Sequence, residues 1–418
     1  MYELESKNRP ERAILCSVDT GEFDAEVSID ELEELARTAG AEVVAKVIQV
    51  RNAPDTALFF GVGKLDEIKT FYMAEEVDLL IFDAELSPSQ QRNIEKYMDT
   101  RVIDRTTLIL DIFASRAYSK EGKLQVELAQ LKYLLPRLVG KGLVLSRLGG
   151  GIGTRGPGET KLESDRRHIR RKIDSISAEL KEVEKRRNIQ RRKREKDGVE
   201  TVVIVGYTNA GKSTLMNHLT EAGVLTENML FATLDPTARG LTLPSGREVV
   251  LIDTVGLVRR LPYHLVEAFK STLEEATSAD VILNVCDASS PECAEHLEVT
   301  KELLKELGAA SKPIISVMNK CDMVYDEDTL PIIGKTVFIS ALRGSGIDKL
   351  LEAIDEALPP DRKRCIYLFP YDDIAPSNEV REDGTVFLEE YTDEGLKIDV
   401  LCSTRIVNKL SKYIKEIF

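Results

Sequence analysis

The sequence feature that most constrains the fold of this chain is GYTNAGKST, residues 206–214, which directly follows the apolar run TVVIV. An apolar strand, a glycine-containing turn with a lysine and a hydroxyl residue, and then a helical pattern are typical of a P-loop. In such a loop the backbone N–H groups and the helix N-terminus surround phosphate, and the fold around it is an open α/β sheet. The stretch therefore predicts a nucleotide site on a doubly wound, mostly parallel sheet.

The predicted phosphate-binding residues are contiguous. They are Gly206, Tyr207, Thr208, Asn209, Ala210, Gly211, Lys212, Ser213 and Thr214. Lys212 is expected to reach the outer phosphates and to assist catalysis, and the Ser213 hydroxyl is expected to ligate Mg²⁺. The alternative, a glycine turn that binds nothing, is hard to reconcile with the strand before it and the helix after it.

Three further motifs indicate which nucleotide is bound. DTVG supplies Asp253, Thr254, Val255 and Gly256, where Asp253 would hold the metal through water and the Gly256 N–H would contact the γ-phosphate. NKCD and SAL supply the base pocket, with Asn319, Lys320, Asp322, Ser340, Ala341 and Leu342. Asn319 is expected to meet the purine edge, and the Ala341 N–H is expected to meet guanine O6. The Asp322 carboxylate can accept two hydrogen bonds from guanine that adenine cannot donate, so GTP and GDP are the predicted ligands.

A second protein ligand for the metal is expected from a threonine between the first helix of this domain and DTVG. The candidate loop is FATLDPTAR, which supplies Phe231, Ala232, Thr233, Leu234 and Asp235. Spacing alone does not choose among Thr226, Thr233 and Thr237.

The chain is predicted to fold as four parts. Alternating strand and helix patterns predict a small α/β domain over 1–118 and the GTP-binding domain over 198–360. Leucines at 124, 128, 131, 135 and 138, and apolar residues at 169, 173, 176, 180 and 183, predict a long αα-hairpin over 119–197, with Pro136 or Gly140 ending its first helix. Residues 361–418 predict a small α+β module that ends in an amphipathic helix over 403–417.

The net charge of −14 argues against general nucleic-acid affinity, but the basic residues are segregated. Residues 160–197 hold 15 Lys or Arg against 8 Asp or Glu. The glycine-rich string GGGIGTRGPGETK, residues 149–161, lies between the two predicted helices rather than after a strand, which favours a loop tip over a second phosphate site.

Taken together, GGGIGTRGPGETKLESDRR, GYTNAGKST, FATLDPTAR, DTVGLVRRLP and NKCD resemble the HflX family of GTPases over roughly residues 10–360. The resemblance implies that Thr233 is the second Mg²⁺ ligand and a catalytic residue. It also implies binding to the large ribosomal subunit and its RNA, and splitting or rescue of stalled ribosomes.

On this basis the glycine-rich tip is expected to dock on ribosomal RNA by shape and phosphate contact. The candidate RNA-contacting residues are Arg155, Lys161, Arg166, Arg167, Arg170 and Arg171. A flexible turn beside a solvated helix face is the alternative. RRNIQRRKR, residues 186–194, could be a further RNA contact or a solvated linker helix.

Hydrolysis is expected to be slow without a partner. Leu257 follows DTVG at the position where many GTPases place a glutamine that orients water. Asn209 resembles an asparagine with which some GTPases bind K⁺, and a role that only braces the neighbouring loop is equally compatible with the sequence.

Two functions other than ribosome splitting stay open. One is a GTP-switched RNA-binding factor in subunit assembly. The other is a second nucleotide site at GVGKLDEI, residues 61–68, for which an ordinary strand-to-helix turn is the better interpretation. The six dispersed cysteines, the polar start and the lack of a long apolar run predict a cytoplasmic protein without disulfides or a membrane span. A monomer is expected, although no sequence feature shows the oligomeric state.

Overall fold

The computed structural model describes most of the chain, in ranges separated by gaps. These ranges are 9–138, 157–196, 198–220, 231, 237–260, 275–325, 330–360 and 362–418, and within 157–196 side chains are described at 163–189, 191 and 194. By its contacts the chain divides into two compact units, which are described separately. The first holds Met1–Glu182, Glu227–Asp235 and Val255–Ser271, and the second holds Val183–Thr226, Pro236–Thr254 and Thr272–Phe418.

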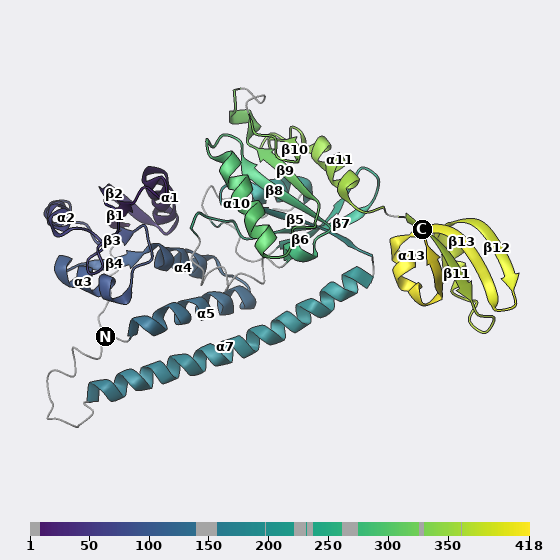
Figure 1. Cartoon of the computed structure of the whole chain (residues 1–418), viewed down its shortest axis with the longest axis horizontal. Helices are drawn as coiled ribbons and strands as arrows, with labels where there is room; N and C mark the ends of the chain where they lie inside the picture. The colour runs from purple at the N-terminus through teal and green to yellow at the C-terminus, as the bar shows by residue number, and fades with distance from the viewer. Residues whose placement is uncertain are drawn as a thin grey trace. The chain divides into compact units, whose positions relative to one another are not determined.

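The first unit contains a four-stranded parallel sheet, as the alternating pattern predicted (Figure 1). In the order β2-β1-β3-β4, its strands are β1 (Glu11–Asp19), β2 (Ala41–Val50), β3 (Leu79–Phe82) and β4 (Arg101–Asp104). Its helices are α1 (Ala25–Thr38), α2 (Val62–Ala74), α3 (Pro88–Met98) and α4 (Arg105–Arg116). No predicted element corresponds to α4, because it is buried on most sides and its apolar run hides the helical period.

The segment GVGKLDEI forms the start of α2. Gly61 is the N-cap residue with φ −68° and ψ 147°, an extended backbone that does not require glycine. Lys64 lies in the first turn of the helix, and its Nζ is 2.7 Å from Glu67 Oε2. The geometry therefore agrees with an ordinary helix start rather than with a phosphate loop.

The predicted helical hairpin consists of α5 (Lys120–Arg137) and α7 (Pro157–Lys196) (Figure 1). Lys120 Nζ lies 3.3 Å from Glu179 Oε2, and Lys172 pairs with Glu127. The earlier residue of α5 pairs with the later residue of α7, and the later residue of α5 pairs with the earlier one of α7. The two helices therefore run antiparallel. On α7 the predicted apolar positions are less exposed than their neighbours, and Ile176 is buried.

α5 also buries a second face that the leucine spacing does not reveal. Val126, Ala129 and Tyr133 join the hydrophobic core of the N-terminal sheet domain, whereas the predicted seam leucines are half-buried. The helix ends one residue after Pro136, one of the two predicted end points, and Gly140 lies outside the described residues. α5 therefore has two neighbours: its buried face joins the core of the N-terminal sheet domain, and Lys120 and Glu127 form ion pairs with α7.

The second unit contains a six-stranded sheet in the order β10-β9-β8-β5-β7-β6. Neighbouring strands are parallel except for β6 and β7, which confirms the predicted mostly parallel sheet. The strands are β5 (Glu200–Gly206), β6 (Thr237–Thr242), β7 (Glu248–Asp253), β8 (Val281–Asp287), β9 (Ile314–Asn319) and β10 (Lys335–Phe338). Its helices include α8 (Lys212–Thr220), α10 (Cys293–Glu306) and α11 (Ile347–Ala357).

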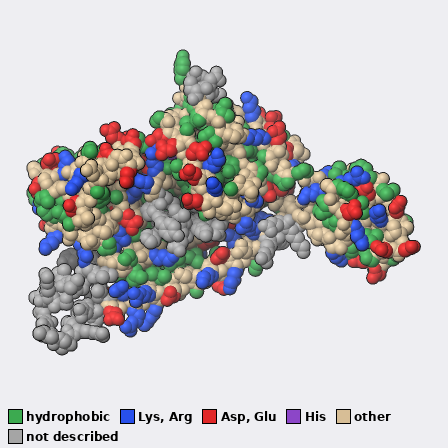
Figure 2. Space-filling view, in the orientation of Figure 1, with side chains coloured by type: hydrophobic (Ala, Val, Ile, Leu, Met, Phe, Trp, Pro, Cys, Tyr) green, Lys and Arg blue, Asp and Glu red, His purple; other side chains and the backbone are tan. Residues whose placement is uncertain are grey.

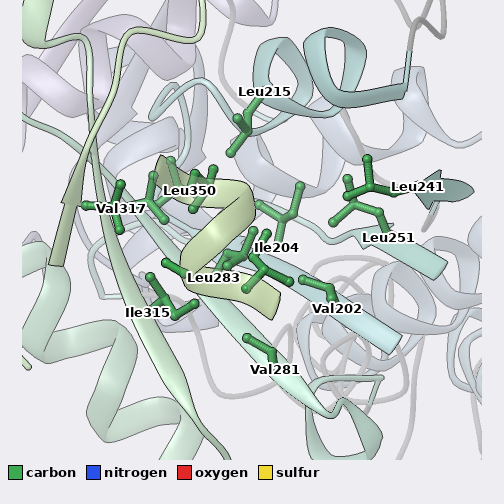
Figure 3. Packing of buried hydrophobic residues seen from close by; sticks show 14 of the residues in the cluster. Val202, Ile204, Leu215, Leu241, Leu251, Val281, Leu283, Ile315, Val317 and Leu350 are labelled. Atoms are coloured by element: carbon green, nitrogen blue, oxygen red, sulfur yellow. The ribbon is translucent and has the colours of Figure 1, made fainter. Parts of the chain in front are cut away.

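Apolar side chains of this sheet pack against α8 and α11 (Figure 3). The fully buried members of the cluster include Val202, Ile204, Leu215, Leu251, Leu283, Val317 and Leu350. Close packing fixes the strands, and the motif residues follow the carboxyl ends of β5, β7 and β9, where open α/β sheets bind ligands.

The C-terminal module is an antiparallel sheet in the order β12-β13-β11-β14. Its elements are β11 (Arg362–Phe369), α12 (Ser377–Asp383), β12 (Thr385–Thr392), β13 (Gly395–Ser403), α13 (Thr404–Lys409) and β14 (Ile414–Ile417). The predicted amphipathic helix over 403–417 is wrong beyond Lys409, because Ile414–Ile417 pairs with β11 instead. The backbone hydrogen-bonding groups at the edge of β11 outweigh the helical spacing of the side chains.

All six cysteines lie in the described ranges; each is buried, and none forms a disulfide. Burial raises the pKa of the Cys365 thiol to about 11 and of the Cys286 thiol to about 12. Burial also raises the pKa of Cys16 well above its ordinary range. Thiols of this kind are protonated near neutral pH and react slowly.

Candidate functional site

The turn after β5 is held closely against neighbouring chain segments. Gly206 is in register with Val285 of β8, and a Cβ at Gly206 would lie 2.1 Å from the Val285 carbonyl oxygen. Gly211 has φ of +88°, and a Cβ there would lie 2.2 Å from Asn319 Nδ2. Asn209 takes a left-handed φ of 60°, which asparagine tolerates better than most residues. Both glycines are therefore required by the close approach of other groups.

Lys212 begins α8 and is buried, with 6% of its surface exposed. Its Nζ donates to the carbonyl oxygens of Gly206 at 3.0 Å and Tyr207 at 2.6 Å. Burial lowers the pKa of Lys212 to about 8, and the nearby Asp253 carboxylate opposes this shift. An incompletely neutralised buried ammonium favours an anionic ligand, as expected of a phosphate-binding lysine.

Ser213 and Asp253 place two oxygen groups together at the ends of different elements. Ser213 Oγ donates to Asp253 Oδ2 at 3.2 Å, and Asp253 is the last residue of β7. Thr254 Oγ1 donates to the Ile204 carbonyl oxygen at 2.7 Å, which ties the start of DTVG to β5. Hydroxyl and carboxylate oxygens are ligands that Mg²⁺ prefers, so this pair fits the predicted metal site.

Asn319 braces the expected base pocket. Its Nδ2 donates to the Ala210 carbonyl oxygen at 2.8 Å, and its Oδ1 accepts the Ala341 N–H at 2.9 Å. The side chain is buried, and both bonds join loops that are far apart in sequence. Sequence reasoning placed Asn319 at the purine edge, whereas the structure shows that it first connects the P-loop to the SAL loop.

Two neighbouring side chains orient the Asp322 carboxylate. Ser340 Oγ donates to Asp322 Oδ1 at 2.7 Å, and Arg343 Nε lies 3.4 Å from Asp322 Oδ2. Lys320 has a left-handed φ of 64°, and its Nζ pairs with Asp287 Oδ2 at 2.7 Å. An oriented carboxylate can accept hydrogen bonds from guanine N1 and from its exocyclic amine, so this geometry agrees with the predicted preference for GTP. The Leu342 side chain is exposed.

Three family models match successive parts of the chain. They are described as "GTP-binding GTPase N-terminal" over residues 26–114, "GTP-binding GTPase Middle Region" over 116–194 and "50S ribosome-binding GTPase" over 201–320. A GTPase HflX from Caldanaerobacter subterraneus subsp. tengcongensis is 50% identical over 405 residues, which cover 97% of this chain and 94% of the relative. The chain belongs to the HflX family of GTPases. It is accordingly a GTP-binding protein and a GTP hydrolase.

Other HflX relatives extend the match across distant bacteria. A GTPase HflX from Escherichia coli is 44% identical over 398 residues, with 91% of this chain and 93% of the relative covered. Among solved structures, a GTP-binding protein from the archaeon Sulfolobus solfataricus in complex with GDP is 28% identical, with a TM-score of 0.44. That match covers 83% of this chain and 98% of the archaeal chain.

Several predicted HflX site residues lie outside the described residues: Arg155, Thr226, Ala232, Thr233, Leu234 and Asp235, together with the side chain of Lys161. Thr237, one of the three candidate metal ligands, is the first residue of β6 and is in register with Asp253. Phe231, Val255 and Gly256 belong to the first compact unit. The choice of Thr233 stays a prediction.

The predicted RNA-contacting arginines of α7 are mostly exposed. Arg167, Arg170 and Arg171 are exposed, Arg166 is half-buried, and Arg167 is 3.9 Å from Glu163. Figure 2 shows Lys and Arg side chains gathered along this helix. None of the helices in the described ranges is both long and apolar enough to cross a membrane.

Two contacts in the second unit were not found from the sequence. The His296 ring stacks on Tyr207, with centroids 3.8 Å apart and an interplanar angle of 17°. Arg187 and Arg194, in the second basic cluster, each lie 3.7 Å from a carboxylate oxygen of the buried Glu275. The basic cluster over residues 186–194 therefore contacts a buried carboxylate of the same unit. No local sequence pattern indicated this contact.

Proposed function

We propose that this HflX-family GTPase binds the large ribosomal subunit and uses GTP to separate or rescue stalled ribosomes. The observation that carries the proposal is the exposed set Arg167, Arg170 and Arg171 on the 40-residue helix α7, in the same chain as the guanine-nucleotide motifs. Exposed arginines close in sequence to a glycine-rich segment suit contact with RNA phosphates. The description of the matched family model as a 50S ribosome-binding GTPase supports this partner.

Mg²⁺ is part of the proposal. Ser213 and Asp253 would hold the ion, with Thr233 added by the family resemblance, and the bound ion would neutralise charge on the β- and γ-phosphates. Lys212 would hold the outer phosphate oxygens, and its buried position excludes competing water. Asn209 is the residue that would contact K⁺, if that ion takes part.

Ribosome-dependent turnover follows from the residue after DTVG. Leu257 carries no group that can orient the attacking water, so a partner must complete the arrangement. We expect slow intrinsic hydrolysis and strong acceleration by large subunits. A cytoplasmic location is part of the same proposal.

The first test compares GTP turnover with and without purified large ribosomal subunits, in buffer that contains MgCl₂ and KCl. Strong stimulation in the wild type and none in Lys212→Ala would support the proposal. Lys212-dependent basal turnover without stimulation would leave a GTPase with a different partner. A parallel measurement in NaCl tests the proposed role of K⁺. If K⁺ takes part, the rate of GTP turnover should be lower in NaCl than in KCl.

A matched pair of charge reversals tests the RNA contact. Arg167→Glu with Arg171→Glu places two acidic residues four apart on exposed α7 positions. Lys301→Glu with Lys305→Glu makes the same change on the exposed face of α10. Salt-dependent binding to large subunits should fall only in the α7 variant, and equal binding by both variants would contradict the proposal.

Sedimentation separates the two ribosomal roles. A splitting factor should convert mature 70S ribosomes into subunits in the presence of GTP. Binding confined to precursor particles would instead support a role in subunit assembly.

A further inference from the structure

Helix α10 is tied to the sheet of the second unit at two points. Asn284 Nδ2 of β8 donates to the Leu297 carbonyl oxygen at 3.2 Å, and Cys286 Sγ of the same strand lies 3.2 Å from the Cys293 carbonyl oxygen. All four residues are buried. Because protein interiors are closely packed, a helix held in this way is a firm support for any side chain that projects from it.

His296 projects from α10 onto the P-loop. Its imidazole lies almost parallel to the Tyr207 ring, with centroids 3.8 Å apart and an interplanar angle of 17°. At this separation the two rings are in van der Waals contact across their faces. Glu292 Oε2 lies 3.5 Å from His296 Nε2, and Thr300 Oγ1 donates to the His296 carbonyl oxygen at 2.8 Å. Both the ring and the main chain of His296 are therefore held in place.

Tyr207 is the second residue of the P-loop, and its main chain contacts the phosphate-binding lysine. Its carbonyl oxygen accepts hydrogen bonds from Lys212 Nζ at 2.6 Å and from the Ala210 N–H at 3.3 Å. Tyr207 itself is buried. The ring and the carbonyl group belong to one residue, so immobilising the ring restricts the orientation of that carbonyl group.

The turn between these contacts has an unusual backbone conformation. Asn209 takes a left-handed φ of 60°, which a residue with a side chain keeps only where the surrounding structure imposes it. After Asn209 in the sequence, the Ala210 carbonyl oxygen is bonded to Asn319. Before it, the Tyr207 ring is stacked on His296. The phosphate-binding turn is therefore fixed on both sides of its left-handed residue.

We infer that His296 is a positioning residue for GTP binding and hydrolysis, which holds the P-loop in its binding conformation through the Tyr207 ring. Backbone N–H groups that already point at the phosphate site need no further ordering when the nucleotide binds. Loss of the stack would free Tyr207, and the loop would then have to be ordered at the expense of binding. The inference rests on GTP binding by this chain and does not depend on the ribosome.

Three replacements of His296 separate the ring contact from the volume that the side chain fills. His296→Ala removes both the ring and the volume. His296→Leu keeps an apolar side chain of similar size without a flat ring. His296→Phe keeps a flat ring that can lie against Tyr207.

The test measures the dissociation constants of fluorescent GDP and of a fluorescent non-hydrolysable GTP analogue on the full chain, without ribosomes. His296→Ala and His296→Leu should each weaken both nucleotides by about five- to tenfold. The two factors should be alike, because GDP and GTP share the α- and β-phosphates that a P-loop surrounds. His296→Phe should bind within about threefold of the wild type, and kcat/KM for GTP should follow the same order.

Leu304→Val is the matched control on the same helix. Leu304 is buried two turns beyond His296 and packs among apolar residues of β5 and β8. This truncation should lower the melting temperature of the nucleotide-free protein and leave both dissociation constants unchanged. Equal losses of affinity in Leu304→Val and His296→Ala would overturn the inference, because the stability of α10 rather than the stack would then set the affinity.

Three further outcomes at His296 would also contradict the inference. Wild-type affinity in His296→Ala would show that the stack does not position the P-loop. Wild-type affinity in His296→Leu would show that filled volume, not the ring, holds Tyr207. Equal losses in His296→Phe and His296→Ala would show that a flat ring on Tyr207 is not what maintains the loop.

Discussion

The Asn319 amide oxygen accepts the Ala341 N–H at 2.9 Å, so one side chain at the end of β9 orients the backbone group expected to meet guanine O6. The same amide holds the Ala210 carbonyl oxygen of the P-loop. The loops predicted to bind phosphate and base are therefore joined by one buried side chain.

Asn319→Ala removes both bonds and leaves two buried backbone groups unsatisfied. We expect a loss of about 2 kcal/mol in stability. GDP affinity should fall about tenfold, which is the equilibrium equivalent of roughly 1.4 kcal/mol. Fluorescence titration with labelled GDP measures the affinity.

Asn284→Ala is the matched control for this substitution. Asn284 is equally buried, in the middle of β8, and its Nδ2 donates to the Leu297 carbonyl oxygen at 3.2 Å, away from the base loops. Its replacement should affect stability with little effect on GDP affinity. Equal losses of GDP affinity in the two variants would show that the two Asn319 hydrogen bonds have no specific role in nucleotide binding.

GTP affinity should depend on pH through Lys212. The pKa of the buried amine is about 8, and bound phosphates will raise it. Below pH 8 the amine is charged in both states, so affinity is constant. Above pH 8 binding must take up a proton, so affinity falls by up to about tenfold per pH unit until the pKa of the complex is reached.

Calorimetric titration in two buffers with different ionisation heats measures this proton uptake directly. Wild-type protein at pH 8.5 should take up a fraction of a proton on binding GTP. In Lys212→Ala that uptake should disappear. Proton uptake of the same size in both proteins would show that a group other than Lys212 takes up the proton.

Asp322→Asn should change base preference. The amide cannot accept hydrogen bonds from both guanine N1 and the exocyclic amine, but it can donate to the oxygen that xanthine carries there. GTP affinity should fall by at least about a hundredfold, and xanthosine triphosphate should bind more tightly than GTP. Asp287→Asn, which removes the partner of Lys320, should weaken both nucleotides alike.

Glu275→Gln should loosen the C-terminal end of α7. Loss of the buried charge between Arg187 and Arg194 is expected to cost about 1–2 kcal/mol, since both arginines are partly exposed. Hydrogen exchange over residues 183–194 should accelerate. Glu298→Gln, which breaks an exposed pair with Lys301 at 3.6 Å, should leave exchange in this region unchanged.

The candidate site was predictable from sequence because its chemistry is contiguous. Lys212 and Ser213 follow one strand, and their positions depend on a local turn and on the strand before it. Asp322 is similar, because its motif directly follows β9. The order of these motifs along the chain was sufficient to predict the sheet that carries them.

The elements that were missed depend on partners far along the chain. α4 is covered on most sides, so its own period is hidden, and β14 forms only because β11 offers an edge. The pairing of Arg260 with Asp83 joins residues 177 positions apart. A single sequence shows the charge of each of these groups but not which opposite charge it meets.

The burial of every cysteine also gives the chain its own reporters of local opening. Cys16 lies in β1, Cys286 in β8, and Cys365 and Cys402 lie in the C-terminal sheet. A thiol reagent can reach each of them only when the surrounding elements separate. Labelling rates resolved by mass spectrometry will therefore rank the opening free energies of three parts of one unaltered protein, before and after it binds nucleotide.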